Sequence, residues 1–355
     1  MPAEWEPHEA TWIAWPHNRD DWPGKFQPIP WIYADIVRHL ARGEHVRIIV
    51  NGRAHQRSAE RTLKDAHVAL ERVQFFCWKT DRVWTRDSGP IFVAREKDSA
   101  LAMTHWQFNG WAKYSNHQRD EKLPALIAQK FALESWQPKL KINGKLRRIV
   151  LEGGSIDVNG RGTLITTEEC LLDPKVQTRN PGLSRLELET VFRDTLGITN
   201  TLWLGKGIAG DDTHGHVDDL CRFVKPGTVV LCRENNPKDV NYRPLAENRE
   251  RLQGMHLEKG ASIEVIDLPM PAPLYFDGVR LPASYANFYF SNAAVLVPTF
   301  NDPQDRIALG ILAELFPDRP VVGIHAVDLV WGLGTIHCLT QQEPIAAAKS
   351  PRDSR

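Results

Sequence analysis

A cysteine near the C-terminal end of the chain has the surroundings of a reactive thiol. Cys338 follows the turn Gly332-Leu333-Gly334, whose glycines let the backbone approach a ligand closely. An isolated buried cysteine is usually an inert packing residue, but residues 335–342 are mostly polar, which is unusual company for a core position. A thiol becomes a nucleophile when a nearby cation or base lowers its pKa. We therefore interpret Cys338 as a candidate nucleophile.

The segment 210–219 is the second place where chemistry is concentrated, because it holds two histidines and four aspartates. At strand spacing, His216 and Asp218 share one face. This pairing suits an acid–base imidazole beside a carboxylate that binds a cation. A metal site is the second interpretation, since His-x-His occurs in such sites, although no third ligand stands at a typical metal spacing. The third interpretation of this segment is a polar loop without a chemical role.

Two further carboxylates follow the same pattern of a polar turn. Glu152 stands where the apolar run 149–151 ends and two glycines begin. It is either a solvated strand-end carboxylate or a group that orients His216 and stabilises its imidazolium. Asp87 is either a turn residue ahead of a proline or a second carboxylate for a planar cation, with Trp84 as a stacking wall. A guanidinium suits both contacts, because it binds carboxylates bidentately and stacks on aromatic faces.

Composition narrows the class of protein. The 355 residues include 44 basic and 44 acidic ones, so the formal net charge is zero, which argues against binding nucleic acid or membrane surfaces through bulk charge. No apolar run is long enough to span a bilayer, and the first residues lack the basic and apolar regions of a signal peptide. The five cysteines form no CxxC pair, so we expect reduced thiols, no zinc ribbon and a cytoplasmic protein.

Helical periodicity alternates with short apolar runs along the chain. We expect helices over 31–42, 55–71, 123–135, 183–197, 246–259 and 303–316, leading to strands at 45–50, 73–78, 146–151, 201–204, 261–268 and 321–324. Hairpins are expected between these units, at 91–104, 155–167, 219–232 and 285–297.

Counting 31–78 as one double unit gives five helix–strand units, which indicates a closed, repetitive architecture. An ordinary doubly wound sheet is the alternative. The candidate residues follow the strands of successive units, so in a propeller they would converge on the axis. This convergence favours the propeller.

Five stretches together carry more information than any of them alone. They are MPAEWEPHEATWIAWP at 1–16, WTRDSGP at 84–90, LEGGSIDVNGRGTLITTEECLL at 151–172, GDDTHGHVDDLCRF at 210–223 and GLGTIHCLTQQEP at 332–344. In this order and spacing, they resemble the agmatine deiminase and bacterial-type peptidylarginine deiminase family of the guanidine-modifying (pentein) superfamily. The resemblance implies an α/β fold, a five-bladed α/β propeller with pseudo-fivefold repeats, in a single catalytic domain over 1–350 with a tail at 351–355.

The resemblance also implies roles for individual residues. Cys338 would be the nucleophile, with His216 and Glu152 as its partners, and Asp87 and Asp218 would bracket the guanidinium. Asp212 occupies the position where agmatine deiminases usually have glutamate, so we expect it near the distal end of the substrate.

The expected activity is hydrolysis of a guanidinium C–N bond through a cysteine thiouronium intermediate. The favoured substrate is agmatine, giving N-carbamoylputrescine and ammonia in putrescine biosynthesis. We expect no cofactor, no metal, no nucleic-acid or membrane partner, and we allow for a homo-oligomer. The alternatives are a peptidylarginine deiminase with the same core, a metal-dependent hydrolase using His214, His216 and nearby aspartates, and a non-catalytic pentein binding module.

Overall fold

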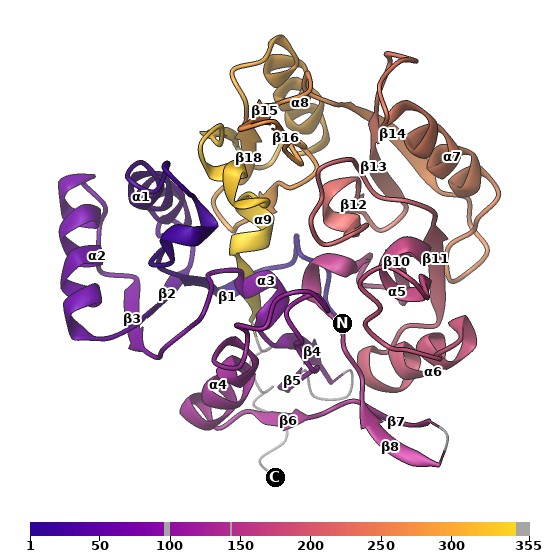
Figure 1. The fold of residues 1–355 in the computed structure, drawn as a ribbon, viewed down its shortest axis with the longest axis horizontal. Helices are drawn as coiled ribbons and strands as arrows, with labels where there is room; N and C mark the ends of the chain where they lie inside the picture. Colours follow the sequence, from indigo (N-terminus) through magenta and orange to yellow (C-terminus); the bar gives the residue numbers. More distant parts are fainter. Residues whose placement is uncertain (96–99, 143, 346–355) are drawn as a thin grey trace.

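The computed structural model describes residues 1–95, 100–142 and 144–345. Within these residues, five sheets that each combine antiparallel and parallel pairs lie around a common centre (Figure 1). In the order of the ring, the sheets are β20 (Gln341–Pro344), β1 (His8–Ala14), β2 (His45–Val50) and β3 (Val73–Cys77); β4 (Ile91–Ala94), β5 (Leu101–Thr104) and β6 (Glu134–Trp136); β9 (Asp157–Val158), β10 (Thr163–Thr167) and β11 (Asn200–Leu204); β12 (Cys221–Lys225), β13 (Thr228–Arg233) and β14 (Glu264–Pro269); and β17 (Tyr289–Phe290), β18 (Val295–Thr299) and β19 (Val321–His325).

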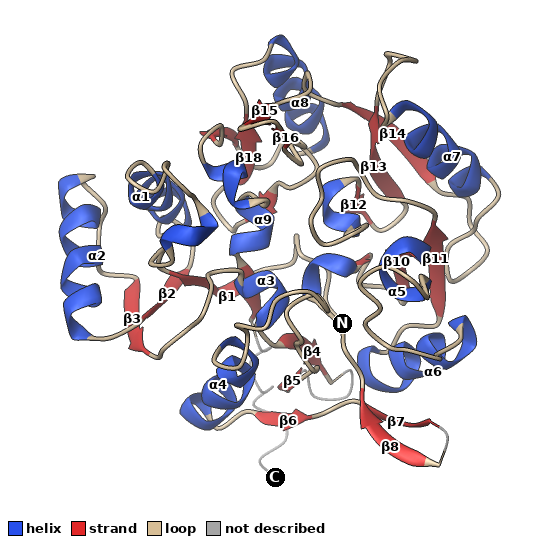
Figure 2. Ribbon diagram, viewed as in Figure 1, coloured by secondary structure: helices blue, strands red, loops and turns tan. Residues whose placement is uncertain are grey.

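Every sheet is built by the same rule. An antiparallel pair is followed by a strand that runs parallel to its neighbour and is reached through a helix. The crossover helices are α1 (Ile29–Leu40), α2 (Arg53–Asp65), α4 (Leu123–Phe131), α6 (Arg185–Leu196), α7 (Tyr242–Gln253) and α8 (Pro303–Leu315). These helices lie at the periphery, and the shorter α3 (Thr85–Ser88) and α9 (Ile336–Leu339) lie near the centre (Figure 2). No helix in the described ranges is long and apolar enough to cross a membrane.

Most of the expected elements are confirmed. All six helices form, with ends that shift by a few residues, and the four hairpins are β4–β5, β9–β10, β12–β13 and β17–β18. Helix α8 begins as its sequence indicates, because Asp302 caps it and forms a reciprocal capping box with Asp305. The predicted tail at 351–355 lies outside the described residues, and so do the last five residues of the predicted domain.

One strand assignment was wrong. The strand that follows α4 is β6, which pairs in parallel with β5, whereas Lys145–Arg148 forms β8 of a separate hairpin with β7 (Lys139–Ile142). Strand β6 is three residues long and exposed, so its sequence has no apolar pattern that could reveal it. The second short hairpin joins β15 (Tyr275–Phe276) to β16 (Val279–Arg280).

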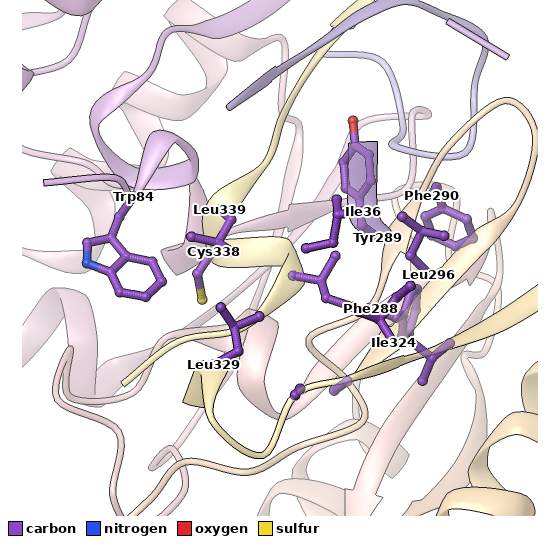
Figure 3. Close-up of a cluster of buried hydrophobic side chains, with 14 of the residues drawn as sticks. Ile36, Trp84, Phe288, Tyr289, Phe290, Leu296, Ile324, Leu329, Cys338 and Leu339 are labelled. Carbon is purple, nitrogen blue, oxygen red and sulfur yellow. The ribbon is translucent and has the colours of Figure 1, made fainter. Parts of the chain in front are cut away.

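The two ends of the described chain meet in the first sheet. Strand β20 runs antiparallel to β1, with Thr11 opposite Gln342 and Trp12 opposite Gln341. Helix α9, which carries Cys338 and Leu339, stands directly before β20 and is packed into the apolar core beside Trp84 and Leu329 (Figure 3). Closing the ring therefore fixes the position of this cysteine.

A buried ion pair reinforces the closure. Glu343 of β20 pairs with Arg47 of β2 and also accepts a hydrogen bond from Trp12 Nε1 at 2.8 Å. The Arg47 guanidinium lies 5.4 Å from the Trp12 ring and 4.1 Å from the Phe131 ring. The ion pair, the hydrogen bond from Trp12 and the two aromatic rings together compensate the cost of burying the two charges.

Replacing Glu343 with alanine should leave the Arg47 guanidinium buried without its counter-charge. Removing one partner of a buried pair typically costs about 3–5 kcal/mol, so Glu343→Ala should lower the free energy of unfolding by about 3 kcal/mol or more. Urea unfolding followed by tryptophan fluorescence measures the change. Asp194→Ala, which breaks the exposed pair between Arg193 and Asp194, is the control and should leave the free energy nearly unchanged. An equally small effect of both changes would contradict the role given to this pair.

Candidate active site

The structure brings the candidate residues from four different turns to the centre of the ring. Asp87 lies on α3, Glu152 precedes a short 3₁₀ helix over Gly153–Ser155, His216 and Asp218 lie at the start of another over Val217–Asp219, and Cys338 lies on α9. All five side chains are buried, Cys338 being the most accessible at 7 %.

His216 is surrounded by carboxylates. Its Nδ1 lies 3.8 Å from Asp87 Oδ1 and 3.9 Å from Asp218 Oδ1, and its Nε2 lies 3.8 Å from Glu152 Oε2. Burial lowers the pKa of His216, but Asp87, Cys170 and Glu152 outweigh it and raise the net pKa well above the ordinary value. The site therefore favours the imidazolium, a proton donor, at neutral pH.

Behind His216, a buried arginine holds Glu152. Arg179 Nε donates to both carboxylate oxygens of Glu152 at 3.2 Å, and Arg179 Nη2 donates to the carbonyl of Thr213 at 2.7 Å. Burial raises the pKa of Glu152, but the charge of Arg179 and the contact with His216 outweigh it, so the net pKa is lowered. Glu152 is thus a fixed carboxylate. Sequence reasoning missed Arg179, because nothing in its spacing links it to the motifs.

Asp87 is oriented by two donors. The backbone N–H of Gly154 donates to Oδ1 at 3.1 Å, and Trp111 Nε1 donates to Oδ2 at 2.9 Å. Burial raises the pKa of Asp87 to about 6, and the nearby carboxylates add to this shift while His216 opposes it. A cation bound next to Asp87 would therefore lower this pKa and stabilise the ionised carboxylate.

Asp218 has one oxygen engaged and one free. Oδ2 lies 2.6 Å from His337 Nδ1 and 3.8 Å from Cys338 Sγ. Burial raises the pKa of Asp218, but its hydrogen bond to His337 and the charge of that residue outweigh burial and hold the pKa down. Among the described residues, buried Oδ1 has no hydrogen-bond partner. A buried acceptor without a partner beside a thiol marks a position for a donor on a bound molecule.

Asn287 holds the cysteine and was not identified from the sequence. Its Nδ2 donates to Cys338 Sγ at 3.2 Å, and its Oδ1 accepts from Thr335 Oγ1 at 2.7 Å and from the backbone N–H of His337 at 3.1 Å. Burial raises the pKa of the Cys338 thiol well above its usual value, and Asp218, Asp219 and Asp87 raise it further. With no positively charged ligand bound, these effects favour the protonated thiol.

A cavity of about 250 Å³ opens onto Cys338 and Asp87. Trp84, one of the predicted substrate contacts, forms part of its wall, and three further aspartates and one arginine line it: Asp20, Asp21, Asp212 and Arg82. Asp212 is bound by Lys113 and accepts from Tyr114 Oη at 2.6 Å. Arg82 pairs with Asp21 at 2.5 Å.

Two groups of side chains in the described ranges have the geometry to bind a metal ion. One is Glu152, Cys170 and His216, and the other is Asp218, Asp219 and Cys338. His214, which the metal-hydrolase alternative requires, belongs to neither. The positive charge of Arg179 on Glu152 opposes a second cation in the first group. All five cysteines, each within the described residues, are free thiols.

The fold is that of the guanidine-modifying pentein enzymes. Two solved structures superpose on it: an agmatine deiminase of Enterococcus faecalis (TM-score 0.86, 30 % identity, 97 % of this chain and 95 % of that chain) and a putative arginine deiminase from Porphyromonas gingivalis (TM-score 0.83, 32 % identity, 97 % of each chain). The chain belongs to the Porphyromonas-type peptidyl-arginine deiminase family, whose model matches residues 1–344. An agmatine deiminase from Stutzerimonas stutzeri strain A1501 is 37 % identical, with 97 % of this chain and 95 % of the relative covered. These findings confirm the resemblance inferred from the five motifs.

Gly154 is required where it stands, which gives a direct test of the site geometry. A Cβ there would lie 2.6 Å from His216 Nδ1, 2.9 Å from Asp87 Oδ1 and 3.0 Å from Asp218 Oδ2. Gly154→Ala should therefore displace these groups and lower kcat/KM for a guanidinium substrate by about a hundredfold. Steady-state detection of the ureido product measures the loss.

The control for this change is Gly310→Ala. Gly310 lies in α8, where nothing approaches an added Cβ within 4 Å, so this variant should retain full activity. A folded Gly154→Ala protein with unchanged kinetics would show that these three side chains do not act together.

Proposed function

We propose that this protein hydrolyses guanidinium C–N bonds with Cys338 as the nucleophile, and that it converts agmatine to N-carbamoylputrescine and ammonia in putrescine biosynthesis. The observation that carries this proposal is the buried Cys338 thiol, which lies 3.8 Å from Asp218 and lines the same cavity as Asp87, while Asp218 keeps an unpartnered oxygen within the described structure. The reaction needs neither metal nor cofactor, and we expect the enzyme to be cytoplasmic.

In the bound complex, Asp87 and Asp218 hold the planar cation and direct its carbon toward the sulfur. Both carboxylates are buried, so little water screens their attraction for the guanidinium. Trp84 forms the wall beside the plane of the cation. The charge of the substrate favours the ionised form of the Cys338 thiol, whose proton is released to solvent.

The first half of the reaction forms the covalent intermediate. The thiolate attacks the guanidinium carbon and gives a tetrahedral adduct. His216, as imidazolium, donates its proton to the leaving nitrogen, so ammonia departs and a thiouronium remains on Cys338. Glu152, held by Arg179, keeps the imidazole in place and stabilises its positive charge.

The second half releases the product. Neutral His216 now removes a proton from water, and the resulting hydroxide attacks the thiouronium carbon. The C–S bond breaks, and the sulfur leaves as thiolate. The proton of the new hydroxyl group passes to this sulfur, which restores the resting thiol and releases the neutral ureido product. One water is consumed, one ammonia is formed and the proton that Cys338 released at the start remains in solvent, while His216 returns to its starting protonation state.

The lining of the cavity supports a dication as substrate. Asp20, Asp21 and Asp212 face it together with a single cation, Arg82, among the lining residues of the described structure. Agmatine carries an ammonium at its far end, whereas arginine carries a carboxylate there as well. Lys113 partly neutralises Asp212 and Arg82 pairs with Asp21, so Asp20 adds to the negative charge that Asp212 supplies. Peptidyl-arginine is the runner-up substrate, and the name of the family favours it.

Cys338→Ser tests the covalent mechanism. The variant should fold and lose turnover, because a hydroxyl is a far weaker nucleophile at neutral pH. A haloacetamidine should give one adduct with the wild type, on Cys338, and leave the other four cysteines unlabelled. Cys77→Ser is the matched control, since Cys77 is an exposed free thiol, and it should keep full activity.

Three outcomes would count against this mechanism. They are near-normal turnover of folded Cys338→Ser, labelling mainly at another cysteine, and activity that is lost on chelation and restored by zinc. The last of these would favour a metal-dependent hydrolase.

Substrate choice is the second test. Agmatine should exceed free arginine in kcat/KM by at least about a hundredfold, or roughly 3 kcal/mol of transition-state binding. Asp212→Asn should reduce that margin and should have much less effect on alkylation of Cys338. Steady-state kinetics with agmatine, arginine and an arginyl peptide decide the question. A preference for the peptide would replace agmatine with peptidyl-arginine and refute the role given to Asp212.

A further inference from the structure

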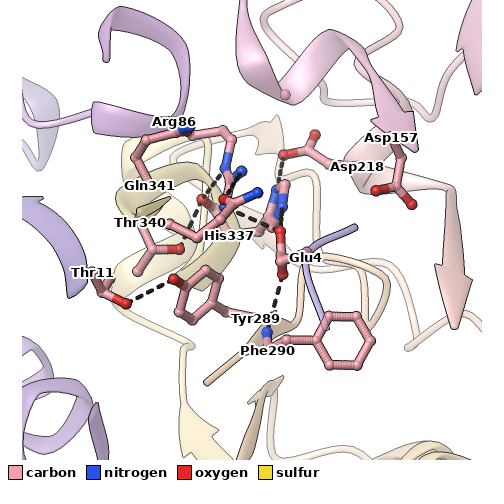
Figure 4. A network of polar contacts seen from close by, with 12 residues as sticks. Glu4, Thr11, Arg86, Asp157, Asp218, Tyr289, Phe290, His337, Thr340 and Gln341 are labelled. Atoms are coloured by element: carbon pink, nitrogen blue, oxygen red, sulfur yellow. Dashed lines mark hydrogen bonds and ion pairs between the residues drawn. The ribbon is translucent and has the colours of Figure 1, made fainter. Parts of the chain in front are cut away.

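Glu4, near the N-terminal end of the chain, places a buried carboxylate next to His337, the residue before Cys338. Glu4 is 3 % exposed, and its two oxygens are bound by four donors. Oε1 accepts a hydrogen bond from the backbone N–H of Phe290 at 3.0 Å and forms an ion pair with Arg222 Nη2, also at 3.0 Å. Oε2 lies 3.2 Å from Arg86 Nη2 and 2.7 Å from His337 Nε2 (Figure 4). None of these partners is close to Glu4 in the sequence.

His337 connects this carboxylate to the substrate site. Its Nε2 contacts Glu4, and its Nδ1 lies 2.6 Å from Asp218 Oδ2. A neutral imidazole has a single N–H, so His337 donates to both carboxylates when it carries both protons. The ring is thereby held at two opposite edges, and the residue that follows it is Cys338.

Glu4 is the counter-charge for a buried group of cations. Burial raises the pKa of Glu4, but Arg222, His337 and Arg86 outweigh burial and hold the net pKa well below the ordinary value. Arg222 is fully buried, and its other ion-pair partner, Asp157, lies 3.4 Å from Nε. Arg86 also donates through Nε to the carbonyl of His337 at 3.3 Å. Removing Glu4 would leave these cations facing fewer carboxylates than they need.

We propose that Glu4 is a positioning residue for guanidinium binding. Acting through His337, it fixes the Asp218 carboxylate so that Oδ2 is engaged and Oδ1 stays free for the substrate. This inference rests on the proposed function, because it takes Asp218 as a ligand of the guanidinium. It makes the first residues of the chain part of the machinery that binds substrate, although Glu4 never touches it.

A double-mutant cycle distinguishes action of Glu4 through His337 from a purely structural role. If Glu4 acts through His337, then Glu4→Gln should lower kcat/KM for agmatine about tenfold or more, mainly through KM, as should His337→Asn. The kcat/KM of the double variant should lie within about threefold of that of the less active single variant. Glu6→Gln is the matched control, because Glu6 is exposed on the same segment, and it should leave both constants unchanged.

Binding measured without turnover separates this inference from the proposed function. In the Cys338→Ser background, adding Glu4→Gln should weaken agmatine binding about tenfold in calorimetry. If wild type forms no ureido product, the proposed function fails. The inference fails if Glu4→Gln leaves KM and agmatine binding unchanged. It also fails if the reductions in kcat/KM caused by Glu4→Gln and His337→Asn multiply in the double variant.

Glu4→Asp covers the case in which Glu4→Gln does not fold. Aspartate keeps the negative charge that Arg86 and Arg222 need, but it is one methylene shorter and cannot reach His337 in the same way. It should therefore raise KM while the melting temperature stays close to that of wild type. An unchanged KM in this variant would overturn the proposal.

Discussion

The site depends on keeping several carboxylates ionised in a place from which water is excluded. Burying an unpaired carboxylate costs several kcal/mol, and Asp87, Glu152 and Asp218 are all buried at the centre of the ring. Fixed cations behind the site compensate part of this charge, as Arg179 does for Glu152. The compensation is incomplete on the side of the cavity, where Asp87 has a raised pKa. In the proposed complex, a guanidinium supplies the missing positive charge together with a donor for the unpartnered Asp218 Oδ1.

Ring closure and assembly of the site are one structural event. Strand β20 joins β1, and the same closure brings His337 and Cys338 from one end of the chain against Glu4 from the other. The candidate residues lie on four turns that are far apart in the sequence, so no single blade contains a complete site. Stability of the closed ring and correct placement of the nucleophile therefore depend on many of the same contacts.

The sequence predicts what is local or repeated. The helices and hairpins follow from periodicity and turn residues, and Cys338 and His216 could be proposed because polar turns after successive strands meet at the axis of a propeller. Arg179, Asn287 and Glu4 could not be found in this way, because their partners are distant in the chain and they lie in irregular segments. Strand β6 was not predicted for a related reason, because only its backbone pairing with β5 defines it as a strand.

The electrostatics of the site also indicate when the nucleophile becomes activated in the proposed reaction and how the product leaves. Burial and three carboxylates raise the pKa of Cys338, so the free site stores no thiolate that could react with other electrophiles. A cationic substrate reverses this balance, because its charge stabilises both the thiolate and the two carboxylates that hold it. Deimination turns the cationic guanidinium into a neutral ureido group, so the product loses the attraction to Asp87 and Asp218 that bound the substrate. In this mechanism, the same buried charges select the substrate, activate the nucleophile and promote release of the product.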